Sequence, residues 1–441
     1  MSDFVSLDLV PILAGLLAAL SCGLLGNFLV LRRLSLMGDA ISHSVLPGIV
    51  VAFLLTSSRA PIPVFIGALI AGLITVLLVE LIRRAGRVES GAAMGVAFSI
   101  MFAVGILLMH QVAADRIDLD ADCVLHGQLQ SLNWASTMSW SDLLDPGVVW
   151  LLPRQVHVLA VTLAVVVSFV FVMYKELRIA AFDPQLASAQ GISPGIMHVL
   201  LMLLVAATTV AAFEAVGSIL VIAMLIGPAA TARLLTERLA PQIAVSALIA
   251  VLASLGGYTT AVFVPIALGA PVDLNASGMM TTMLGVLLVL AIVFSPSRGL
   301  IARALNTRRL ASRVRRDDLL AFLYREHESG QRTSSLAVAA ERWRYNSDHL
   351  ESLLVELERS GLIVKMSSGI ALTEAGLREG ASIVRKHRLW EAYLVDRAGL
   401  RPDHVHDVAE KLEHIPLDES ALPLMPSLLD PHGKPIPEPR A

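Results

Sequence analysis

The hydrophobic pattern divides the chain at about residue 297. Up to that point long apolar runs alternate with short polar segments, and about 20 apolar residues suffice for one helix to cross a bilayer. We count nine such runs, the sixth and seventh being short: 7–31, 40–56, 61–82, 92–110, 155–174, 197–213, 215–232, 242–268 and 279–296. Beyond them charged residues become frequent, so we expect a soluble part to follow a polytopic membrane part.

Basic residues predict how these runs are oriented in the membrane. They follow the odd-numbered runs: Arg32, Arg33, Arg83, Arg84, Arg87, Lys175, Arg178, Arg233, Arg238, Arg298 and Arg303. Because Lys and Arg collect in cytoplasmic loops, the N-terminus is predicted outside and the C-terminal part inside. The loop 111–154 then faces outward and the loop 175–196 faces the cytoplasm. One miscounted helix would reverse the side of the N-terminus.

Composition supports a membrane protein. Of the 441 residues, 55% are hydrophobic and only 16% are charged, whereas soluble chains have about 25% charged residues. The net charge of -3 neither favours nor excludes nucleic acid as a partner. The two cysteines provide neither a disulfide framework nor a Cys-rich zinc site.

The second apolar run carries a carboxylate and an imidazole one helical turn apart. Asp39 and His43 occur in LSLMGDAISHSVLPGIV. Charged groups inside a bilayer are costly unless they face a cavity or a partner, which makes them functional candidates. Together the pair offers one oxygen and one nitrogen ligand to a divalent cation. Alternatively, Asp39 caps the start of the helix and His43 bonds to a backbone carbonyl.

The soluble part begins with a basic connector and continues as helices with a small β element. Residues 298–316 read RGLIARALNTRRLASRVRR, which we interpret as a flank of the membrane rather than a nucleic-acid patch. Helical periodicity follows in DDLLAFLYREHE, SSLAVAAERWR and HLESLLVELERSGLIV, and then two short β-rich pieces surround a Ser-Ser-Gly turn. This order of three helices and a β-hairpin is typical of a winged helix. Residues 374–415 are predicted helical and 416–441 irregular.

Two helical segments of this part carry metal-ligand residue types. In VHDVAEKLEHI the offsets i, i+4, i+7 and i+8 place four such side chains on one helix face: His406, Glu410, Glu413 and His414. Upstream, His387 and Glu391 form a further i, i+4 pair. Oxygen and nitrogen ligands without sulfur favour Mn(II) or Fe(II), although they also bind Zn(II). The alternative is an exposed helix with salt bridges on its surface.

Three motifs of the membrane part resemble those of a transporter family. RRLSLMGDAISHSVLPG, ELRIAAFDPQLASAQGI and AVGSILVIAMLIGPAATARLLTER are similar to the membrane subunits of bacterial ABC importers for zinc, manganese and iron, over about residues 7–297. The resemblance implies that Asp39 and His43 line the cation path. It also implies that the loop 175–196 contains a coupling helix that seats on an ATPase, with these residues: Phe182, Asp183, Pro184 and Gly191.

The resemblance also implies partners. No G-x-x-x-x-G-K-[ST] motif occurs in the chain, so we expect no enzyme activity and a separate ATPase subunit. The other implied partners are an extracytoplasmic metal-binding protein and a second permease chain, identical or not.

The tail resembles a second family. From residue 316 on, DDLLAFLY, SGLIV, LTEAG, VRKHRLWEAYL, VHDVAEKLEHI and DPHGKPIP are similar to the diphtheria-toxin-repressor family of metal-dependent regulators, which join a winged helix to a metal-binding and dimerisation domain. The resemblance implies one site as in the manganese-responsive branch, made of Asp318, His387, Glu410, Glu413 and His414. A second site, as in the iron branch, would use Glu391 and His406, and His387 contributes to it in that branch.

The resemblance leaves two points of the tail open. It does not assign His387 to one of the two sites, and Ala321 stands where the manganese branch has a further acidic ligand.

The helix in YNSDHLESLLVELERSG, which would read DNA, is acidic, whereas phosphate contacts need Lys or Arg. We therefore expect a divalent metal ion (Mn, Fe or Zn) as cofactor of a cytoplasmic metal-sensing tail. The alternative is a permease–repressor fusion that binds an operator; a metal exporter or receptor on the same scaffold is a third reading.

Together these expectations describe a mainly α protein of the bacterial plasma membrane. A transmembrane metal-permease domain with about eight or nine helices covers 1–297, and a basic linker covers 298–316. A winged-helix-like domain is expected at 317–376 and a metal-binding and dimerisation domain at 377–441. The expected function is import of manganese, zinc or iron, with the tail sensing the metal.

Overall fold

The computed structural model describes the chain in two compact units, Met1–Arg303 and Ala304–Ala441. The described residues are 7–34, 36–56, 61–112, 129–132, 134, 147, 150–269, 274–296, 298–331, 333, 347–366, 369–412, 414 and 429–438. The division falls within the basic segment 298–316, and the helix α14 (Leu300–Glu328) runs through that segment into the second unit.

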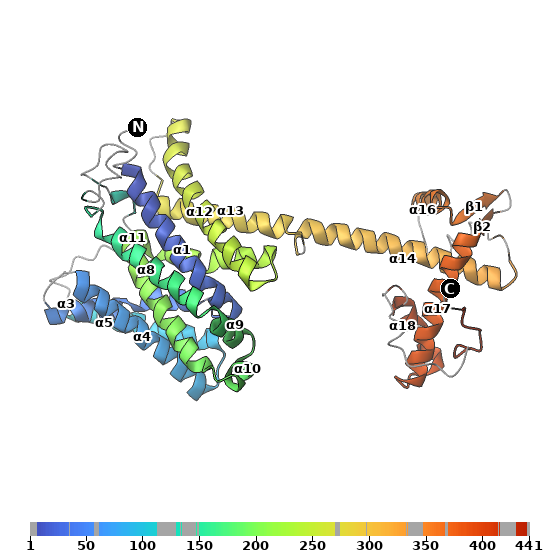
Figure 1. Ribbon diagram of the computed structural model, residues 1–441, viewed down its shortest axis with the longest axis horizontal. Helices are drawn as coiled ribbons and strands as arrows, with labels where there is room; N and C mark the ends of the chain where they lie inside the picture. The colour runs from blue at the N-terminus through green and yellow to red at the C-terminus, as the bar shows by residue number, and fades with distance from the viewer. Residues whose placement is uncertain are drawn as a thin grey trace. The chain divides into compact units, whose positions relative to one another are not determined.

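The first unit is a bundle of apolar helices (Figure 1). Its elements are α1 (Leu9–Leu31), α2 (Met37–Ser44), α3 (Leu46–Thr56), α4 (Pro61–Gly86), α5 (Ser90–Val112), η2 (Leu129–Ser131), α8 (Arg154–Val172), α9 (Tyr174–Phe182), α10 (Pro184–Ala189), α11 (Pro194–Leu235), α12 (Leu239–Leu268) and α13 (Ala276–Phe294). Among the described residues, eight helical segments are long and apolar enough to cross a membrane, α2 and α3 together forming one of them.

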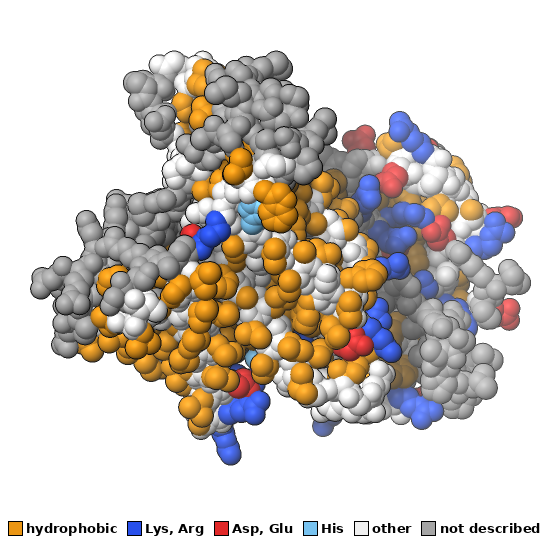
Figure 2. All heavy atoms as spheres, turned by 60° about the vertical axis from the view of Figure 1, so that its left-hand side comes forward, with side chains coloured by type: hydrophobic (Ala, Val, Ile, Leu, Met, Phe, Trp, Pro, Cys, Tyr) orange, Lys and Arg blue, Asp and Glu red, His pale blue; other side chains and the backbone are white. Residues whose placement is uncertain are grey.

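The surface of this unit is apolar as well as its interior. Side chains such as Ile62, Leu81 and Phe171 are more than 60% exposed, and Figure 2 shows hydrophobic side chains covering much of the face in view. In water such a surface would be a liability, whereas in lipid it is the surface that a helical membrane protein needs. The interior is centred on α1, whose Leu25, Phe28 and Leu29 are fully buried. The first unit is therefore a multi-pass membrane bundle.

The sixth and seventh apolar runs lie in one element, α11, which reverses direction at Gly217. Gly38 and Ile41 are within one turn of each other on α2. Gly38 packs against Leu225 of α11. Ile41 and Ala206 of α11 both lie beside Gly72 of α4, so they are close to each other. In a straight helix Ala206 and Leu225 would be about 28 Å apart, too far to meet the same turn of α2. Gly217 itself is non-helical, with φ 79° and ψ 166°. The predicted runs 197–213 and 215–232 are thus the two halves of a helical hairpin.

Both ends of this hairpin lie near the C-terminal end of α1. At the first end, His198 lines a cavity together with Arg32, which follows α1. At the second end, Arg233 donates to Gln242 (3.3 Å), and Gln242 donates to Asn27 of α1 (3.1 Å). The turn between the halves is marked by Glu214, which pairs with Arg154 at the start of α8 (2.5 Å).

Replacing Gly217 by alanine should destabilise the bundle. The φ and ψ of Gly217 belong to a region that only glycine populates readily, and forcing another residue into it costs about 1–3 kcal/mol. We expect a lower unfolding temperature of the detergent-solubilised protein, measured by intrinsic fluorescence. Gly285→Ala is the matched control, because Gly285 lies in the helix α13 with no atom within 4 Å of an added Cβ. Equal stability of both variants would contradict a backbone role for Gly217.

The second unit contains helices and one β-hairpin. After α14 come α16 (Ser347–Arg359), β1 (Ile363–Met366), β2 (Gly369–Leu372), α17 (Glu374–Asp396), η4 (Pro402–His404) and α18 (His406–Leu412). The strands are antiparallel, with Ile363 opposite Leu372. This order agrees with the predicted helices and wing, while the helix predicted over SSLAVAAERWR lies outside the described residues. Most of 416–441, predicted irregular, also lies outside them.

Two hydrophobic clusters hold this unit together. The larger one joins α14, α16, the hairpin and α17 through buried aliphatic side chains, among them Leu320, Leu357, Ile370 and Val384. The smaller one joins α17 to α18 through Leu394, Val405 and Ala409. Since α17 belongs to both clusters, it is the element on which the polar residues of the tail are positioned.

Candidate metal sites

The two candidate metal ligands of the membrane part, Asp39 and His43, belong to the short helix α2. Asp39 is half-buried in the first turn of α2, and α2 packs against α4, α5 and α11. His43 follows one turn later, but its side chain lies outside the described residues. Leu36 occupies the cap position of α2, and Asp39 follows it three residues later in the first turn. A carboxylate in the first turn is stabilised by the positive end of the helix dipole.

The loop between α8 and α11 folds into two short helices, the second with well-defined ends. Asp183 caps α10 by accepting hydrogen bonds from the backbone N–H of Gln185 (3.0 Å) and Leu186 (2.9 Å), and Pro184 occupies the first helical position. Gly191, with φ 78°, ends the turn. Phe182 is 58% exposed and is thus available to a partner protein.

Three ligand atoms converge between α17 and α18. His387 Nε2 lies 3.0 Å from Glu391 Oε1 and 3.0 Å from His406 Nδ1, and His406 Nδ1 lies 2.9 Å from the same carboxylate oxygen. His387 and Glu391 are buried, at 3% and 2% exposure, whereas the side chain of His406 is 49% exposed. The cluster is therefore open to solvent on the side of α18.

Hydrogen bonding alone does not account for this convergence. If both imidazoles donate to the one carboxylate oxygen, their two N–H groups face each other at 3.0 Å without a hydrogen bond between them. A cation at the common centre would bind all three atoms. Ligands at about 2.0–2.2 Å from one ion lie roughly 3 Å from one another, so the spacing fits a divalent transition metal.

The carboxylate of the cluster is ionised at neutral pH. Burial alone would raise the pKa of Glu391, but hydrogen bonds from His387 and His406 lower that pKa to about 2. An anionic carboxylate and two imidazoles form the nitrogen and oxygen ligand set of Mn(II), Fe(II) and Zn(II). His387, which the sequence left between two sites, thus contacts the residues expected for the second one.

A second polar cluster joins α14 to His414, two residues beyond the end of α18. His414 Nε2 lies 3.2 Å from Asp318 Oδ1, and His414 Nδ1 lies 3.6 Å from Asp317 Oδ2. Asp317 was not among the expected ligands, although the Asp-Asp pair in RRDDLL could have suggested it. Glu410 is exposed, Glu413 lies outside the described residues, and Ala321 is a buried core residue. Of the first predicted site, the structure thus brings Asp318 and His414 together.

Arg388, which the sequence analysis missed, anchors α17 to two other segments. Its guanidinium is buried and pairs with Glu328 of α14 (Nη2 to Oε2, 2.5 Å). It also donates to the carbonyl of Pro435 and lies 3.6 Å from the Asp430 carboxylate. Fully buried arginines are rare, and although Arg388 lies in the motif VRKHRLWEAYL, its spacing there does not mark it as buried. The contacts fix α17 directly beside His387.

Comparisons with known proteins find matches to a different family model in each of the two units. Residues 9–144 and 137–294 match the ABC 3 transport family, and residues 373–438 match the iron dependent repressor, metal binding and dimerisation domain. The manganese transport system membrane protein MntD of Bacillus subtilis (strain 168) is 41% identical over 67% of this chain and 95% of its own. The zinc transport system membrane protein TroD of Treponema pallidum (strain Nichols) is 39% identical over 68% of this chain and 77% of its own.

Two further similarities extend these assignments. The manganese transport system membrane protein MntC of Bacillus subtilis is 31% identical over 87% of this chain and 83% of its own, more of the chain than the first unit contains. Among solved structures, a chain of PsaBC from Streptococcus pneumoniae in complex with Fab has a TM-score of 0.52 and 27% identity, covering 68% of this chain and 94% of that one. The match to this MntC thus extends beyond the first unit into the second.

Proposed function

Because the chain belongs to the ABC 3 transport family, we propose that it is the membrane subunit of an importer that carries manganese, zinc or iron into the bacterial cytoplasm. The names of MntD and TroD support a transition-metal substrate. Asp39 and His43, one turn apart on α2 within the bundle, are the proposed ligands on the cation path. Carboxylate and imidazole bind such ions through oxygen and nitrogen.

The importer needs partners that this chain does not supply. A separate ATPase would drive it, an extracytoplasmic binding protein would deliver the metal, and a second permease chain would complete the path. The segment around α10 is the proposed seat for the ATPase, because Asp183, Pro184 and Gly191 fix its ends and Phe182 is exposed. With the basic loops inside, the N-terminus lies outside the cell and the tail lies in the cytoplasm.

The tail is the proposed sensor of the imported metal. The observation that carries this assignment is the convergence of His387, Glu391 and His406 on one centre. Occupation of that centre would lock α18 onto α17. A ligand shifts an equilibrium between two arrangements by its difference in affinity for them. Metal would therefore favour the arrangement in which α18 is docked on α17, which we call the docked tail. We propose that the docked tail lowers uptake when cytoplasmic metal is plentiful.

Loss of the α10 cap should uncouple ATP hydrolysis from transport. Asp183→Ala removes the acceptor for two backbone N–H groups, which costs about 1 kcal/mol and loosens the helix offered to the ATPase. In proteoliposomes containing the chain, its ATPase, the second permease chain and the extracytoplasmic binding protein, we expect ATP-dependent accumulation of Mn(II), Zn(II) or Fe(II) by the native protein. The Asp183→Ala protein should accumulate much less while its bundle stays folded.

Asp183→Asn is the matched control for this experiment, because asparagine caps a helix as well as aspartate does. It should transport like the native protein. Failure of the native protein to accumulate any of the three metals would contradict the proposed function. Native-like transport by Asp183→Ala would contradict only the role of the α10 segment.

A further inference from the structure

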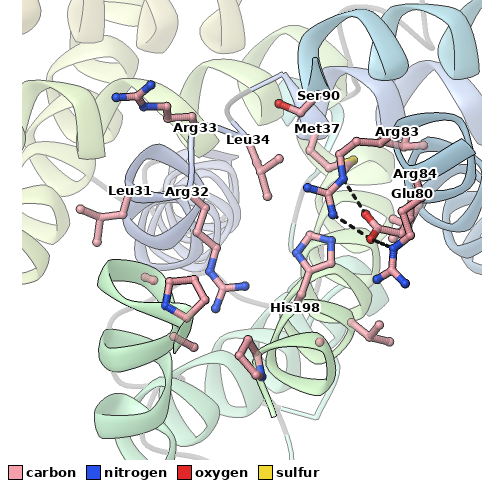
Figure 3. Close-up of a pocket in the computed structure, with 18 residues that line it drawn as sticks. Leu31, Arg32, Arg33, Leu34, Met37, Glu80, Arg83, Arg84, Ser90 and His198 are labelled. Atoms are coloured by element: carbon pink, nitrogen blue, oxygen red, sulfur yellow. Dashed lines mark hydrogen bonds and ion pairs between the residues drawn. The ribbon is translucent and has the colours of Figure 1, made fainter. Parts of the chain in front are cut away.

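A cavity of about 490 Å³ lies at the C-terminal end of α1 (Figure 3). Its wall is formed by the turn between α1 and α2, by α4 and by the segment from α9 to the start of α11. Four arginines line it together with a single carboxylate and a histidine: Arg32, Arg33, Arg83, Arg84, Glu80 and His198. The charge of this lining is strongly positive.

The arginines differ in how well they are neutralised. Glu80 accepts hydrogen bonds from Arg83 (2.8 and 3.0 Å) and from Arg84 (2.5 Å), so one carboxylate serves two guanidinium groups. The Nε and Nη2 atoms of Arg32 are buried and have no hydrogen-bond partner among the described residues. In Figure 3 the Arg32 side chain extends into the space beside His198, whereas Arg33 extends away from it. A buried donor without an acceptor is unfavourable, and an anion in the cavity would supply the acceptor.

The lining identifies the chemistry of the occupant. Uncompensated arginines repel a divalent cation, so the cavity is not a resting place for the transported metal. Arginine forks match the oxygens of a phosphate group. The remaining wall is apolar, with Leu34, Val76 and Val199 among its residues, which suits a phosphate attached to a hydrocarbon chain. Basic pockets between membrane helices on the cytoplasmic side bind anionic lipid headgroups.

We propose that this cavity binds the phosphate of an anionic phospholipid, with Arg32 as the central contact and Arg83 and Arg84 beside it. The same cavity touches Met37 on α2 and both Pro184 of α10 and Pro194 of α11. A bound lipid therefore bridges the ATPase-facing segment to the helix that carries Asp39. Its binding does not depend on the identity of the transported metal.

The test compares lipids on the full-length protein. Native mass spectrometry and thermal unfolding are followed while detergent-solubilised protein is titrated with phosphatidylglycerol, with zwitterionic phosphatidylcholine or with inorganic phosphate. We expect phosphatidylglycerol to bind and to raise the unfolding temperature, and Arg32→Gln to weaken its binding by about tenfold, as for loss of a charge-assisted contact. Arg84→Gln, at a 73% exposed side chain, tests the same site if Arg32→Gln does not fold.

Arg87→Gln is the matched control, since Arg87 is an exposed arginine at the same end of α4 that does not line the cavity. Equal weakening in Arg87→Gln would show general attraction to the basic face and overturn the proposal. Protection by inorganic phosphate as strong as that by phosphatidylglycerol would replace the lipid by a soluble anion. Unchanged lipid binding in both Arg32→Gln and Arg84→Gln would also overturn it.

Discussion

An Asp39→Asn variant is expected to reach the membrane and to remain folded but to lose metal uptake by on the order of 100-fold. Groups that merely support metal ligands change metal affinity by about 10–100-fold, and a direct ligand should matter at least as much. Asparagine keeps the size of the side chain and its ability to bond to the first turn of α2, but it removes the anionic oxygen. His43→Ala should have a similar effect. The measurement is initial uptake of Mn(II), Zn(II) and Fe(II) into cells that lack other importers.

The choice of asparagine separates the two interpretations of Asp39. If the residue acts only through the local structure of α2, Asp39→Asn will transport normally while Asp39→Ala will be less stable. Glu237→Gln is the control for loss of a carboxylate, because Glu237 is an exposed residue between α11 and α12 that pairs with Arg298. Native-like uptake by both Asp39→Asn and His43→Ala would remove the pair from the cation path.

Metal should stabilise the tail strongly, and Glu391→Gln should abolish that effect. The unit from Ala304 to Ala441 has its own hydrophobic clusters, which makes it suitable for study as a fragment. A ligand at 100 times its dissociation constant adds about 2.7 kcal/mol to the free energy of unfolding. For a unit of this size the unfolding temperature should rise by roughly 10 °C. Differential scanning calorimetry with and without Mn(II), Fe(II) or Zn(II) measures the shift.

Three variants separate the possible metal sites of the tail. Glu391→Gln removes the carboxylate at the centre of the His387 cluster, and Asp318→Asn removes the partner of His414. Glu356→Gln is the control, since Glu356 is exposed on α16, away from both clusters in sequence. If the unfolding temperature does not respond to any of the three metals, the tail is no sensor. If Asp318→Asn alone removes the response, the functional site is the one at His414.

The elements that the sequence predicts well are those governed by a local pattern. The apolar runs correspond to helices because lipid requires every backbone group to be bonded within its own segment. The reversal of α11 is harder to predict from a local pattern. Whether the chain continues or returns after residue 213 depends on Gly217. The surrounding sequence AVGSIL is otherwise apolar and contains no typical turn residues besides this glycine. The positive residues on both sides, Lys175 and Arg233, were the better indication of two crossings.

For the tail the residue types were predictable and their grouping was not. The i, i+4 spacing predicts that His387 and Glu391 share a face of α17, as the structure shows. Whether α18 meets that face with His406 or with Glu410 depends on the turn through η4, a 3-10 helix of three residues that is too short to show a periodic pattern. Long-range contacts of Arg388 with Glu328 and Asp430 are equally invisible to a local pattern, because they join segments far apart in the chain.

The contacts of Arg388 have a consequence for the order in which the protein is made. Ribosomes synthesise every expected metal ligand, from Asp318 to His414, before Asp430 and Pro435. Until those later residues arrive, the buried guanidinium beside His387 lacks its Asp430 and Pro435 contacts, and an incompletely compensated buried charge destabilises its surroundings. The His387 cluster therefore gains its full support only when the last residues of the chain have been synthesised. A chain that ends before Asp430 should therefore bind divalent metal at the His387 cluster more weakly than the full chain.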